Sequence, residues 1–144
     1  MAFAIIKYTY FSVTTLDTRK AVRRYMLVYL LLLTAICLTV TGELLLKIGM
    51  NNVGAFSFTP ALLLRTFTQW QVVLGFALIF SGALFWLGVI SRVDFSFAYP
   101  LLAFSYVVSL IPARLILQEQ ISPNRIVGAL IIVVGVIVIT WQRR

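Results

Sequence analysis

The chain has 144 residues, of which 62% are hydrophobic and 11% are charged, and its formal net charge is +8. Soluble domains carry about 25% charged residues, so this composition excludes a soluble domain and predicts an integral membrane protein. One cysteine, Cys37, and no histidine exclude a disulfide framework and argue against a metal site, so we expect neither a metal nor a cofactor. The basic residues flank apolar runs, which indicates contact with membrane lipids and no binding of nucleic acid.

Residues 1–24 form a basic and aromatic arm before the first apolar run. Its apolar part precedes its basic cluster and no small-residue cleavage site follows, so the segment does not resemble a secretory signal. We interpret it as an arm that lies on the membrane or docks on a partner. The alternative is a poorly structured tail.

Four apolar runs are long enough to cross a bilayer, which takes about 20 residues in a helix. They predict an all-α integral membrane fold, a four-helix transmembrane domain over residues 25–144, because backbone groups in lipid must be paired internally. The helices are expected at about residues 25–49, 71–91, 95–117 and 124–141.

The connections between these runs differ in kind. After Pro60 we expect a short interfacial helix with Trp70 as its anchor, and the second and third runs are joined by a tight turn, "SRVD". Ser122 and Pro123 are typical of the cap and first residue of a helix. Basic residues are more numerous on the side of both termini, so the positive-inside rule predicts that both termini are cytoplasmic.

The first run carries charges where lipid is expected. Glu43 lies roughly 9 Å inside the far end of its span and Lys47 roughly 3 Å, and a carboxylate at such depth is a candidate functional residue. With Thr39 one turn earlier, these side chains predict a polar stripe directed into the bundle. The alternative is a helix-internal ion pair between Glu43 and Lys47.

The third run combines polar residues with two prolines. Pro100 and Pro112 predict a bent helix, a feature found where transporters bind substrates, and Tyr99 is a candidate substrate contact. Arg114 is expected either to snorkel or pair with Glu119, or to contact an anion such as phosphate.

Small residues at regular spacing mark the second and fourth runs. Gly75, Gly82, Gly128 and Gly135 are candidates for close helix packing or dimerisation. Trp86, inside the second run, is expected to be a core residue, with a cation cage for a ligand as the alternative.

Three segments, "TGELLLKIGM", "FAYPLLAFSYVVS" and "LQEQISPNRIVGALIIVVGVIVI", resemble the drug/metabolite transporter superfamily in its four-helix, small multidrug resistance-like form. The nearest likeness is to the small subunits of the aminoarabinose-phosphoundecaprenol flippase, on "AYP" at Ala98–Pro100 and "ExxSP" at Glu119–Pro123. Thr39 stands where the small multidrug resistance transporters have their essential glutamate, which argues against proton-coupled drug efflux.

The resemblance implies half of a transport unit in the inner membrane, and no enzyme. The implied function is translocation of a lipid-linked sugar or small metabolite, with Lys47 and Arg114 holding a phosphate and Glu43 and Tyr99 bonding the polar group. It also implies a homodimer or a heterodimer with a similar four-helix subunit, or a larger membrane complex. The alternative function is a non-transporting accessory subunit of such a complex.

Overall fold

The computed structural model describes residues 2–55 and 57–141, and of residues 2–21 the backbone alone. Six helices follow one another along the chain, and the described residues contain no strand. They are α1 (Ala2–Val53), α2 (Pro60–Phe67), α3 (Trp70–Ile90), α4 (Phe95–Leu102), α5 (Phe104–Leu115) and α6 (Pro123–Thr140). The all-α fold is therefore confirmed.

Four helical stretches are long and apolar enough to cross a membrane: Val22–Val53, Trp70–Ile90, Phe95–Leu115 and Pro123–Thr140. They coincide with the four predicted runs, and their bounds differ by a few residues at most. The third stretch is made of α4 and α5 together, and α2 is the short helix expected after Pro60. Trp70 is the first residue of α3 and remains 65% exposed.

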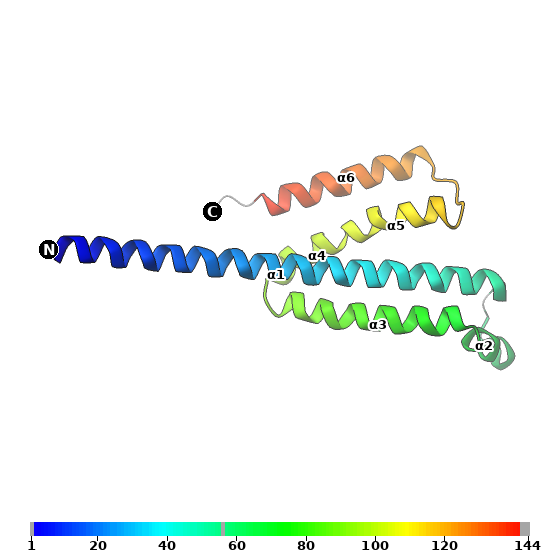
Figure 1. The fold of residues 1–144 in the computed structure, drawn as a ribbon. Helices are drawn as coiled ribbons and strands as arrows, with labels where there is room; N and C mark the ends of the chain where they lie inside the picture. The colour runs from blue at the N-terminus through cyan, green and yellow to red at the C-terminus, as the bar shows by residue number, and fades with distance from the viewer. Residues whose placement is uncertain (1, 56, 142–144) are drawn as a thin grey trace.

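The helix α1 runs through the predicted boundary at residue 24 without a break. The first 41 residues contain no glycine or proline, so no residue in this stretch favours a break in the helix. Figure 1 shows the arm as an extension of α1 that projects past the other helices, at the end of the bundle where α6 finishes. We call this the arm end, and the end where α1 finishes at Val53 the far end.

The closest packing in the molecule joins α1 to α3. A Cβ added to Gly42 would lie 2.7 Å from the carbonyl oxygen of Gly75, and one added to Gly75 would lie 2.8 Å from that of Gly42. A Cβ on Gly82 would lie 2.6 Å from Thr39 Oγ1. Because only glycine lacks this carbon, the two backbones touch directly.

The third span is bent at Ala103, between α4 and α5 (Figure 1). Pro100 has no amide hydrogen and its ring crowds the preceding turn. The Ala103 amide is shared between the carbonyl groups of Tyr99 and Pro100, at 3.3 and 3.2 Å, and Tyr106 then bonds back to Ala103 over three residues. The predicted bend is confirmed, and Pro112 lies inside α5 without ending it.

The last helix, α6, lies at the side of the bundle and contacts α4 and α5. Its first residue is Pro123, after Ser122 in the capping position. Of its residues only Ala129 is buried. The main apolar core lies instead among α1, α3 and α4, around Val28, Val89 and Ala98.

Candidate functional site

The side chains singled out in the sequence fall into two groups at opposite ends of the bundle. Lys47 and Arg114 lie toward the far end, and Trp86 and Tyr99 toward the arm end. Thr39 lies level with Gly82, so the helical rise from Lys47 to Thr39 and on to Trp86 separates the groups by roughly 20 Å. The structure therefore does not bring Tyr99 to Lys47.

The register of α1 explains where its polar residues point. The residues of α1 that meet the α3 glycines recur at intervals of three and four and form one face: Leu31, Ala35, Thr39, Gly42 and Leu46. Thr39 thus packs against α3. One residue further along a helix is a rotation of about 100°, so Glu43 lies on a flank.

Glu43 and Lys47 share this flank, one turn apart, and both are exposed. The expected polar stripe is therefore split between two faces of α1, with Thr39 against α3 and the two charges on an exposed flank. The stripe divides because Thr39, but neither charge, lies on the face that α3 covers.

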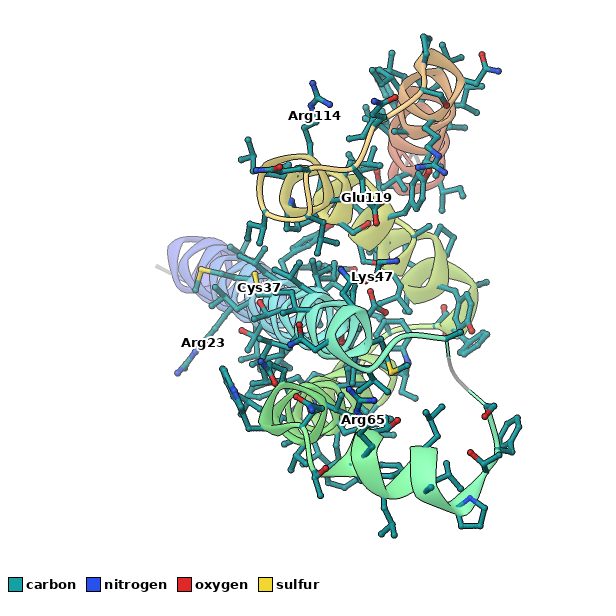
Figure 2. The ribbon with its side chains drawn as sticks, turned by 90° about the vertical axis from the view of Figure 1, so that its right-hand side faces the viewer. Arg23, Cys37, Lys47, Arg65, Arg114 and Glu119 are labelled. Carbon is teal, nitrogen blue, oxygen red and sulfur yellow. The ribbon has the colours of Figure 1, made fainter. Side chains whose placement is uncertain are left out.

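Lys47 forms an ion pair with Glu119, in the connection between α5 and α6. Its Nζ lies 3.8 Å from Glu119 Oε1, with the side chains 53% and 38% exposed. Figure 2 shows Lys47 and Glu119 turned toward one another across the gap between α1 and α5. Among the described residues this pair takes the place of the helix-internal pair with Glu43, which was the alternative interpretation of the sequence.

The backbone holds Glu119 in place. Its amide donates a hydrogen bond to the carbonyl oxygen of Ala113 at 3.0 Å, and its own carbonyl oxygen accepts one from Arg114 Nη1 at 3.4 Å. Gln118 just before it is left-handed, with φ 53°. Arg114 therefore contacts Glu119, as one of the alternatives predicted, and does so through the main-chain carbonyl oxygen of that residue.

Arg114 points away from Lys47, on the other side of α5 (Figure 2). With Gln120, Ile121 and Ile126 it lines an open hollow of about 530 Å³. The structure does not bring Arg114 and Lys47 together around one phosphate. Lys47 faces Glu119, whereas Arg114 lines the hollow on the other side of α5.

An aromatic cluster lies toward the arm end. The ring of Tyr99 meets that of Trp86 edge-on, with centroids 6.1 Å apart, and lies 4.6 Å from that of Phe95. Trp86 packs against the apolar core, while Tyr99 is 54% exposed. Such ring faces can bind a cation or the apolar face of a sugar.

Two arginines meet at the same end of the bundle, between α1 and the end of α3, and the sequence did not reveal this contact. Arg24 Nη2 donates to the carbonyl oxygen of Arg92 at 3.0 Å, and Arg92 Nη1 donates to Gly88 O and Ser91 Oγ. Cations are favourable at the C-terminus of a helix, here α3. The signal in the sequence was the excess of basic residues on the side of both termini. It predicts how the protein is oriented in the membrane, but it does not predict that Arg24 contacts Arg92.

The four glycines differ in their surroundings. Gly75 and Gly82 lie in the contact with α1, whereas a Cβ on Gly128 or Gly135 would meet nothing within 4 Å. In the described part of the chain, no three His, Cys, Asp or Glu side chains form a group that could hold a metal.

Comparison with known proteins gives a consistent set of relatives. A protein of Pseudomonas savastanoi pv. phaseolicola, named "Probable 4-amino-4-deoxy-L-arabinose-phosphoundecaprenol flippase subunit ArnE", is 32% identical over 75% of this chain and 92% of its own length. Proteins of the same name from Pseudomonas aeruginosa and Aeromonas salmonicida are 31% and 34% identical, over 76% of this chain and 93% and 95% of their own lengths. No family model and no solved structure matches the chain.

Proposed function

Since the chain belongs to the family of the ArnE flippase subunits, a family of multi-pass membrane proteins, we propose that it is one subunit of a transporter that moves a polyprenyl-phosphate-linked sugar across the membrane. The observation that carries the proposal is the extent of the match. Relatives named for the flippase are more than 30% identical to the chain over more than 90% of their own lengths, so the shared part is nearly a whole flippase subunit.

The two groups of polar residues suit the two ends of the path. With both termini in the cytoplasm of a cell that holds the protein in its inner membrane, the arm end faces the cytoplasmic leaflet. There the guanidinium groups of Arg24 and Arg92 receive the lipid phosphate and the rings of Trp86 and Tyr99 contact the sugar.

Lys47 receives the phosphate at the far end. Glu43, one turn deeper on the same flank of α1, accepts hydrogen bonds from the sugar on the way. Thr39 borders this path, and Arg114 faces the headgroup layer from the other side of α5. The apolar lipid tail remains in the bilayer throughout, so the protein has only the polar headgroup to enclose.

The partner binds α6. The relatives are named as subunits, and Gly128 and Gly135 present small residues seven apart on a helix that meets no neighbour there, the pattern that lets a second helix approach closely. The strong excess of basic residues on one side works against insertion in both orientations, so a heterodimer with a differently oriented four-helix subunit is favoured over an antiparallel homodimer.

Reconstitution tests the proposal. Vesicles that contain the chain with its co-purified partner are loaded with undecaprenyl-phosphate-linked aminoarabinose on one leaflet, and its appearance on the other is followed with a membrane-impermeant amine reagent. We expect translocation, and a loss of at least tenfold in rate in Lys47→Gln. Equal rates with and without the protein would contradict the flippase function and favour the accessory subunit.

A further inference from the structure

The pair of Lys47 and Glu119 is loose. At 3.8 Å the two atoms lie beyond the 2.7–3.2 Å of an N–H···O hydrogen bond, so the carboxylate restrains none of the three ammonium donors closely. Both side chains are about half exposed, and ion pairs with that exposure contribute about 0–1 kcal/mol. A ligand that offers the same charges can therefore separate them at little cost.

The two partners differ in how they are held. Glu119 follows Gln118, whose left-handed φ of 53° costs a residue other than glycine about 1–3 kcal/mol. Its amide and carbonyl groups are bonded to Ala113 and Arg114. The carboxylate thus extends from a fixed turn, while Lys47 has a flexible stem. The gap between the two charges can widen when Lys47 moves and the turn stays in place.

We propose that Lys47 and Glu119 form a receptor for a zwitterionic headgroup, closed on itself when no substrate is bound. This inference rests on the proposed function and specifies its substrate. The sugar in the relatives' name carries a 4-amino group and is linked through a phosphate. On binding, the phosphate takes the place of the Glu119 carboxylate at Lys47, and the sugar ammonium takes the place of Lys47 at Glu119.

The exchange keeps the charges balanced. One anion and one cation enter, one internal pair opens, and no charge is left without a partner at the membrane edge, where such a charge is costly. A neutral sugar on the same phosphate lipid opens the pair but leaves Glu119 uncompensated. Glu119 therefore selects amino sugars over neutral ones, while Lys47 binds the phosphate of either.

Binding measurements on two lipids test this assignment. The probes are undecaprenyl-phosphate-linked aminoarabinose and the same lipid with its amine acetylated, which replaces the charged ammonium group by a neutral amide. The full chain, with its co-purified partner, is placed in nanodiscs of phosphatidylcholine, and the dissociation constants are compared among wild type, Glu119→Gln and Lys47→Gln. Asp94→Asn, which removes a carboxylate at the arm end, is the matched control.

We expect wild type and Asp94→Asn to prefer the amine lipid by about tenfold. Glu119→Gln removes that preference and binds the acetylated lipid several-fold more tightly than wild type, because the internal competitor is gone. Lys47→Gln binds both lipids more weakly. An unchanged preference in Glu119→Gln, or no binding of either lipid by any variant, overturns the proposal.

Transport separates this proposal from the function beneath it. Translocation that persists while Glu119→Gln keeps its preference leaves the flippase function in place and removes the receptor. If Glu119→Gln loses its preference for the amine lipid but the protein translocates no lipid, the receptor is supported and the flippase function is contradicted. Equal melting temperatures of Glu119→Gln and wild type show that the change in preference does not come from a loss of folding.

Discussion

The chain contains three pairs of glycines, each pair seven residues apart, and the surroundings of the three pairs differ. Gly42 and Gly49 on α1 meet α3, which contributes Gly75 and Gly82, so that the two backbones touch. Gly128 and Gly135 on α6 meet no atom within 4 Å where a Cβ would stand. Glycines at the same spacing thus allow close helix packing within the chain between α1 and α3, whereas those on α6 remain uncovered.

The burial of the helices follows the same division. In the most apolar window of each span, 33% of the residues are buried in Val22–Val53 and 6% in Pro123–Thr140. Lipid tails are as apolar as the side chains they meet, so an exposed apolar helix is stable in a bilayer and close packing needs small residues. The helices α1 and α3 are therefore packed closely against each other within the chain, whereas most of the surface of α6 is exposed and can contact another subunit.

A side chain at the α1–α3 contact should have the largest effect. In Gly75→Val the new Cβ would meet the Gly42 carbonyl oxygen at 2.8 Å, and backbone cannot yield as a flexible side chain can. We expect a loss of about 3 kcal/mol in the free energy of unfolding, as for severe overpacking, measured by denaturant titration in mixed micelles. Gly135→Val is the control, and equal losses in both variants would remove the distinction between the two regions.

Bulk on α6 should act on assembly instead. In Gly128→Leu/Gly135→Leu we expect a folded monomer of wild-type melting temperature, because a Cβ at either position meets nothing within 4 Å. Association with the partner should weaken at least tenfold, since close approach is lost. Energy transfer between labelled subunits in vesicles measures this. Unchanged transfer would place the interface on another helix.

The turn after α5 should show the smallest effect. Gln118→Gly relieves the left-handed backbone at φ 53° but makes the unfolded chain more flexible, and the two terms oppose each other. We expect a gain of up to about 1 kcal/mol in unfolding free energy by the same titration, with lipid preference unchanged. A loss of stability would mean that the glutamine side chain itself holds the turn.

The sequence predicted what depends on local pattern. The four spans, the short helix after Pro60 and the bend near Pro100 follow from runs of apolar residues and from the missing proline amide, and each is present. The partner of Lys47 could not be predicted in this way. It depends on the chain reversing after α5 so that Glu119 faces α1, and the left-handed residue that permits this is a glutamine, with no glycine to mark it.

The glycine pattern had the same limit. The seven-residue spacing that begins at Gly75 and at Gly128 indicates a surface that can pack closely. It does not indicate which helix packs against that surface. The glycine surfaces of the antiparallel helices α1 and α3 pack against each other within the chain. The glycine surface of α6 packs against no other helix of the chain at these positions. The partner of α6 therefore had to be inferred from the structure and from relatives that are named as subunits.

Native mass spectrometry of the protein extracted from its own membranes in mild detergent tests most directly whether the chain is one subunit of a flippase completed across α6. We predict a small complex of this chain with a second four-helix subunit, carrying the mass of a polyprenyl-phosphate lipid, and dissociation of that complex in Gly128→Leu/Gly135→Leu. A lipid-free monomer, or a complex that survives both substitutions, would contradict the account.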